Sequence, residues 1–65
     1  MKHPGNKCIS VQCVSPEGVR KIVFRYHYDD HDDRSRVRAG VKAHARQAEY
    51  QGQGWRTRTR LESVP

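Results

Sequence analysis

Three stretches of this chain alternate between apolar and polar side chains, which is the pattern of a β-strand with one buried face. Successive side chains on a strand point to opposite faces, so every second residue shares a face. The residues expected on the buried faces are Ile9, Val11 and Cys13 in 7–14, Ile22, Phe24, Tyr26 and Tyr28 in 19–28, and Trp55, Thr57, Thr59 and Leu61 in 55–61. The sequence therefore predicts three strands, each with one face in the core.

The segment Ser15-Pro16-Glu17-Gly18 lies between the first two alternating stretches. Proline sets φ in a turn, and glycine accepts the positive φ that other residues avoid. We therefore expect the first two strands to form a hairpin.

A helix is predicted over residues 32–50. The aspartates that precede it suit the free amide groups and the positive end of a helix dipole, and Gly52 and Gly54 follow its end, one of them as a left-handed cap. At about 100° per residue, one narrow arc contains Val37, Val41, His44, Ala45 and Ala48. We expect this arc to pack on the sheet.

The arc opposite this predicted core face carries Ala39, Ala43 and Tyr50. A tyrosine beside small residues suits a protein or dimer interface, because it offers contact area at low entropic cost. The alternative is that alanine occurs there as the best helix former. We keep both interpretations for these three residues.

The order strand, strand, helix, strand predicts an α+β fold of the two-layer ββαβ type. A three-stranded sheet would carry one helix on one face, and the helix would connect the second strand to the third by a parallel crossover. A chain of 65 residues makes a single domain, here residues 1–65 with a lead-in at 1–6 and a tail at 62–65. So small a domain has room for one thin core and for no buried pocket beside it.

The net charge of +6 is unevenly distributed, because four aspartates occupy residues 29–33 and the remainder is strongly basic. Such a field attracts polyanions and acidic protein surfaces alike. Arginine outnumbers lysine by nine to four, which favours a contact surface, since guanidinium groups bind phosphate and carboxylate in a bidentate manner.

The main candidate site is the sheet face turned away from the helix. Its predicted basic residues are Lys21, Arg25, His27, Arg56, Arg58 and Arg60, with Ser10 and Gln12 beside them. Alternate arginines on a strand stand about 6.6–6.8 Å apart, close to the spacing of phosphates along one DNA strand. The alternative is a solvated outer face that keeps a small protein soluble and protects an edge strand.

A second basic stripe follows the predicted helix, where Arg38, Lys42 and Arg46 recur every four residues. We expect it to serve as a secondary patch for the same ligand. That ligand is a nucleic acid, DNA or RNA, in our first interpretation and an acidic protein surface in our second, and a homodimer is a further candidate.

No metal, cofactor or catalytic activity is expected. The aspartates and histidines from His27 to Asp33 suggest a metal site, but helix capping accounts for the aspartates, and the glycine and ligand spacing of a calcium loop are missing. Motifs for nucleophilic, phosphate-cradling or zinc-protease chemistry are also missing.

A cytoplasmic location without membrane contact is expected, because the longest aliphatic or aromatic run is Ile22-Val23-Phe24. Cys8 and Cys13 fall on opposite faces of one predicted strand, so a disulfide between them is not expected.

In its small size, its basic charge and its order of elements, the chain is similar to small proteins of phages and mobile elements. That similarity implies an inhibitor or adaptor that binds a host enzyme, a polymerase or a CRISPR complex. Integrase arm-binding domains also place a three-stranded sheet on DNA, but their helix follows the sheet, whereas here the helix precedes the last strand.

Overall fold

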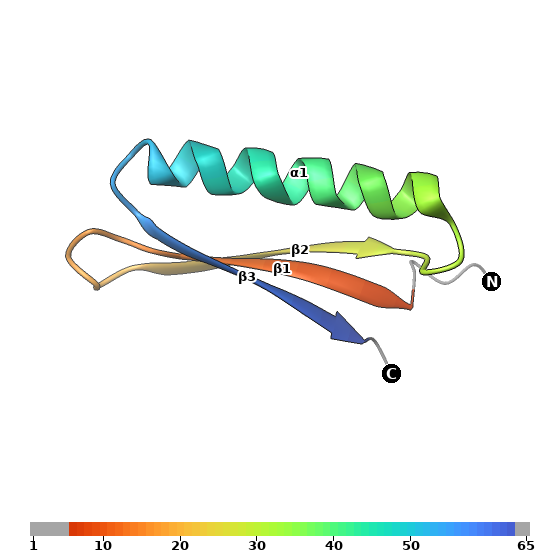
Figure 1. The fold of residues 1–65 in the computed structure, drawn as a ribbon. Helices are drawn as coiled ribbons and strands as arrows, with labels where there is room; N and C mark the ends of the chain where they lie inside the picture. Colours follow the sequence, from red (N-terminus) through yellow and green to blue (C-terminus); the bar gives the residue numbers. More distant parts are fainter. Residues whose placement is uncertain (1–5, 64–65) are drawn as a thin grey trace.

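The computed structural model of the chain describes residues 6–63 and has two layers, a three-stranded sheet and one helix (Figure 1). The elements in chain order are β1 (Lys7–Val14), β2 (Lys21–Tyr28), α1 (Asp33–Gln51) and β3 (Arg56–Ser63). The helix lies along one face of the sheet and contacts all three strands. The predicted α+β class and ββαβ order are confirmed.

The sheet has the order β2-β1-β3, and β1 pairs antiparallel with both neighbours. The strands β2 and β3 therefore run parallel to each other with β1 between them. The predicted crossover through the helix is present, and it spans one intervening strand.

The β1–β2 turn is organised by Ser15, which is buried. Its backbone N–H donates to the carbonyl of Arg20 at 2.9 Å, and its Oγ accepts from the N–H groups of Val19 and Arg20 at 3.1 and 3.0 Å. Gly18 has φ +76°, as predicted for this turn. Because the side chain of Ser15 binds both amides, β2 begins at Lys21, two residues later than the alternation predicted.

The core lies between α1 and the face of the sheet that alternation predicted to be buried. Val11 and Cys13 are fully buried at its centre beside Ala43. Half-buried side chains complete it from both layers, namely Ile9, Phe24, Tyr26, Tyr50 and Trp55. The large side chains come mainly from the sheet, and the helix contributes small ones that let it approach closely.

The prediction of which helix face packs on the sheet is wrong. Val37 and Val41 are 61% and 63% exposed, and the buried helix residues are Ala39 and Ala43. The reason is the position of Tyr50, whose ring packs against Phe24 and Trp55. With this aromatic ring in the core, the helix must turn Ala39 and Ala43 inward, since all three lie on one arc.

Both ends of α1 are capped by side-chain or backbone hydrogen bonds. At the start, the carboxylate of Asp32 accepts from the N–H of Arg34 at 3.0 Å. At the end, the N–H of Trp55 donates to the carbonyl of Tyr50, and that of Gly54 to the carbonyl of Gln51, both at 3.0 Å. This pair of bonds is a Schellman motif, and Gly54 is its left-handed residue with φ +86°.

The predicted tail begins too early, because Glu62 and Ser63 belong to β3 and pair with Cys8 and Lys7. At the other end, the side-chain Oδ1 of Asn6 accepts from the N–H of Asp30 at 2.9 Å, so Asn6 is tied to the loop before the helix. The rest of the predicted lead-in and tail, residues 1–5 and 64–65, lies outside the described residues.

The two cysteines are buried free thiols on opposite faces of β1, as predicted. The helix α1 is too polar to cross a membrane, and the described part of the chain contains no other helix.

Candidate functional site

The sheet face turned away from α1, hereafter the open face, gathers the basic residues of β2 and β3. Pairing β1 with both neighbours sets which side chains share this face. Its members are Cys8, Ser10, Gln12 and Val14 from β1, Lys21, Val23, Arg25 and His27 from β2, and Arg56, Arg58, Arg60 and Glu62 from β3. The six basic residues predicted for this face are thus brought together, and all six are exposed.

The basic side chains form two columns, one on each edge strand, with short β1 side chains between them. Arg25 and Arg60 both pair with Ser10, and Lys21 and Arg56 both pair with Val14. Neighbouring strands lie about 4.7–4.9 Å apart, so the two columns stand roughly 9.5 Å apart at their Cα atoms. The open face therefore has two cationic columns with a row of shorter side chains between them.

The row between the two columns comes from the central strand, β1. Ser10 is 6% exposed and Cys8 2% exposed, although both face away from the helix. Their burial follows from the longer side chains on both flanks, such as Arg25 and Arg60 beside Ser10. Ser10 and Gln12 give this central row hydroxyl and amide groups that can form hydrogen bonds with a ligand.

Negative charge on the open face is confined to one end. Glu62, the single carboxylate among its members, pairs with Cys8 across from His27. The other three rows, toward the β1–β2 turn, carry Lys21, Arg25, Arg56, Arg58 and Arg60 without a carboxylate. Positive potential is therefore strongest over these three rows.

The aromatic rings of the described residues lie on the other side of the sheet, in the core or against the helix. The ring of Phe24 lies 5.5 Å from that of Tyr50, which in turn lies 5.1 Å from Trp55 in a T-shaped arrangement. The open face consequently offers charges and hydrogen-bonding groups, with no aromatic ring of Phe, Tyr or Trp among its described members.

The predicted helix stripe does not behave as one patch. Arg46 lies with its guanidinium 4.4 Å from the centre of the Phe24 ring and donates from Nε to Tyr26 Oη at 3.2 Å. It also pairs with Glu49 at 3.3 Å. The hydrogen bond to Tyr26 raises the pKa of Arg46 above its ordinary value. Arg46 therefore joins α1 to β2, and only Arg38 and Lys42 of the stripe remain candidates for a ligand.

Arg38 and Lys42 instead meet two residues of the open face. A groove of about 290 Å³ runs between β2 and α1, and we call it the β2–α1 groove. Its lining residues are Arg25, Tyr26, His27, Ser35, Arg38, Ala39 and Lys42. Because β2 is an edge strand, Arg25 and His27 reach the groove around that edge. The two basic patches predicted separately are thus continuous.

Tyr26 and Ser35 were not predicted as site residues. Tyr26 was assigned to the core by alternation, and Ser35 stood in the first turn of the predicted helix. A signal was present, because Ser35, Arg38 and Lys42 recur at spacings of three and four, which places them on one side of a helix.

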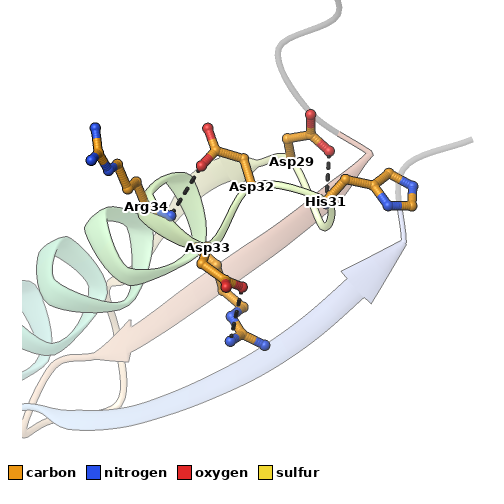
Figure 2. Close-up of polar contacts among 6 residues, drawn as sticks. Asp29, His31, Asp32, Asp33 and Arg34 are labelled. Carbon is orange, nitrogen blue, oxygen red and sulfur yellow. Dashed lines mark hydrogen bonds and ion pairs between the residues drawn. The ribbon is translucent and has the colours of Figure 1, made fainter.

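The aspartates before α1 and at its first residue form local contacts with the chain around them (Figure 2). Asp29 Oδ1 accepts from the N–H of His31 at 2.9 Å, Asp32 caps the helix, and Asp33 pairs with Arg36 at 3.4 Å. Within residues 6–63, no group of three His, Cys, Asp or Glu side chains is arranged to hold a metal ion.

The prediction of an interface at Ala39, Ala43 and Tyr50 is wrong, because it assumed that these residues are exposed. Ala39 and Ala43 are 4% and 3% exposed against the sheet, and Tyr50 is half-buried in the aromatic cluster. The outer side of α1 instead presents Val37 and Val41.

No protein-family model, curated protein or solved structure matches this chain.

Proposed function

We propose that this chain is a small nucleic-acid-binding or regulatory protein that contacts phosphates through the open face. The observation that carries the proposal is the convergence of five cationic side chains from β2 and β3 on an exposed face with one carboxylate. Arginine and lysine are among the side chains that bind the phosphate backbone in protein–DNA complexes. A two-column arrangement allows both edge strands to contact backbone phosphates at once.

The chemistry of the open face favours a duplex over a single strand. Proteins that bind single strands stack bases on aromatic side chains, and the sheet of an RNA-recognition domain does so through exposed rings. Here Phe24, Tyr26 and Trp55 are on the helix side of the sheet. The major groove of B-DNA is about 12 Å wide and admits strands, whereas that of A-form RNA is deep and narrow. Duplex DNA is therefore the ligand we propose.

Fluorescence anisotropy tests this function with labelled duplex DNA, single-stranded DNA, duplex RNA and single-stranded RNA over a series of salt concentrations. We expect duplex DNA to bind with micromolar or higher affinity at low salt and to weaken steeply as salt rises, because bound phosphates release their counterions. Failure of all four ligands to bind at low salt would overturn the proposed function. Preference for a single strand would overturn the choice of duplex.

A protein partner is our second candidate, in the form of an inhibitor or adaptor that binds an acidic protein surface. The observation that favours it is the exposure of Val37 and Val41 on the outer side of α1, because protein interfaces bury apolar side chains and nucleic acids offer them little. In that case one or two anchors, such as Arg58, would dominate the affinity. A charge reversal on the partner would then rescue a charge reversal at Arg58.

We also propose that the protein acts by binding and without catalysis, since the four arginines and one lysine of the open face are groups suited to binding anions. A cytoplasmic location is part of the same proposal. It is supported by the cysteine content, since two cysteines on opposite faces of β1 do not make the disulfide framework that is typical of small secreted domains.

A further inference from the structure

The β2–α1 groove differs from the open face in being concave and in having walls from two layers. Arg25 and His27 come from β2, and Arg38 and Lys42 from α1. The ion pairs among residues 6–63 join Arg36 to Asp33 and Arg46 to Glu49. Arg25, Arg38 and Lys42 therefore form no ion pair with a carboxylate of the described chain.

Two residues that line the groove, Tyr26 and Ser35, also carry hydroxyl groups that can donate. Tyr26 Oη accepts from Arg46 Nε at 3.2 Å, and Ser35 Oγ accepts from the N–H of Asp29 at 3.1 Å. A hydroxyl that accepts one hydrogen bond still has its own proton to donate. Neither hydroxyl donates to an acceptor within residues 6–63, so both protons can serve a ligand in the groove.

The carboxylates of the nearby aspartates add no negative charge to the lining of the groove. The carboxylates of Asp29, Asp32 and Asp33 are bound by His31 N–H, Arg34 N–H and the Arg36 side chain, respectively (Figure 2). None of them lines the groove. The groove is consequently lined by cationic and neutral donors, without a carboxylate.

We propose that the β2–α1 groove is a phosphate-binding site. The oxygens of a phosphate match the charged donors of Arg25, Arg38 and Lys42, and the hydroxyl of Ser35 or of Tyr26 can add a neutral donor from one end of the groove. Hydrogen bonds from charged donors to phosphate are short and roughly twice as strong as neutral ones. The phosphate belongs either to a nucleic-acid backbone that extends from the open face around the β2 edge or to a free phosphorylated molecule.

Titration of inorganic phosphate into the ¹⁵N-labelled full chain, at constant ionic strength, tests the site by NMR. We expect saturable shifts at the amides of Ser35, Arg38 and Lys42, with smaller changes at Arg56 and Arg58. In Arg38→Gln/Lys42→Gln the affinity should fall by about tenfold or more, since each lost charged hydrogen bond is substantial. The matched control Arg34→Gln/Arg36→Gln removes the same charge from the same helix and should bind phosphate as the wild type does.

Three results would overturn the site: shifts that do not saturate, shifts spread evenly over all arginines, or equal phosphate affinity in both double variants. The spectrum of each variant also reports whether it is folded, so a loss of binding is not confused with a loss of structure.

A second arm identifies the source of the phosphate and separates this site from the proposed function. Duplex DNA that shifts the Ser35 amide and competes with inorganic phosphate supports a backbone phosphate. Phosphate binding that persists in Arg58→Gln/Arg60→Gln, in which DNA binding is reduced, supports a site that does not depend on the open face. Phosphate binding lost in Arg58→Gln/Arg60→Gln while retained in Arg38→Gln/Lys42→Gln would contradict the groove as the site.

Discussion

Arg25 and Arg60 lie on opposite edge strands and pair with the same residue of the central strand, Ser10. Two long cationic side chains therefore flank a buried serine, and the same arrangement repeats with Lys21 and Arg56 around Val14. This relationship exists because β1 pairs with both β2 and β3 in one sheet. It concentrates charge from segments more than thirty residues apart in the chain.

Replacement of Asp32 by alanine should lower the free energy of unfolding by about 1 kcal/mol, the usual value of an N-cap. Its carboxylate accepts from the N–H of Arg34, whereas the side chain of Asp30 forms no hydrogen bond or ion pair within the described residues. Asp30→Ala is thus the matched control and should change stability by less than about 0.5 kcal/mol. Equal losses in urea denaturation would contradict capping by Asp32.

The two valines at positions 11 and 41 should respond differently to alanine. Val11 is fully buried, so Val11→Ala should cost about 2 kcal/mol of folding free energy. Val41 is 63% exposed on the helix, and Val41→Ala should be neutral or slightly stabilising because alanine is the better helix former. Thermal and urea unfolding measure both. A large loss in Val41→Ala would mean that the helix packs through its other face.

Alanine at two glycines should have opposite effects on stability. A Cβ at Gly40 meets open space in the middle of α1, so Gly40→Ala should add about 1 kcal/mol. Gly54 has φ +86°, where a side chain is strained, so Gly54→Ala should cost about 1–2 kcal/mol. Shifts of the same sign in both variants would argue against the left-handed end of α1.

The Cys13 thiol should make stability depend on alkaline pH. Burial raises its pKa above the ordinary value of 9.0, and the charge of Arg46 partly offsets this. A raised pKa stabilises the folded state in full below the ordinary value, and this contribution is lost as pH rises through the raised value. The wild type should therefore lose stability relative to Cys13→Ala from about pH 9 upward. Urea denaturation from about pH 7 to about pH 10.5 measures the difference, and a constant difference would contradict the prediction.

The strands and the open face were predictable because every second residue of a strand shares a face. Alternation alone assigned Lys21, Arg25 and His27 to one side and Arg56, Arg58 and Arg60 to the same side of another strand. The strand order and the pairing of both edges with β1 were not predictable, because alternation says nothing about which strands are neighbours.

The prediction of the buried helix face failed because it was based on the hydrophobicity of single residues, whereas packing against the sheet decides which face is buried. Val37 and Val41 are more apolar than Ala39 and Ala43, yet the small residues face the sheet. The spacing of Ala39, Ala43, Arg46 and Tyr50 marks one side of a helix, and Tyr50, as the helix's aromatic residue, could have identified it as the core side. The role of Arg46 was hidden in the sequence, since its contacts with Phe24 and Tyr26 depend on how the helix crosses β2.

The central claim is that the open face binds nucleic acid, and two matched double variants test it most directly. Arg58→Gln/Arg60→Gln removes two charges from the open face, and Arg34→Gln/Arg36→Gln removes two from the first turn of α1, on the other side of the sheet. Anisotropy with labelled duplex DNA over a salt series gives the slope of log affinity against log salt. We predict that the open-face variant binds more weakly with a slope reduced by about two, because two phosphate contacts are lost, and that the helix variant keeps the wild-type slope. Equal effects of the two variants, or wild-type binding by the open-face variant, would contradict the account.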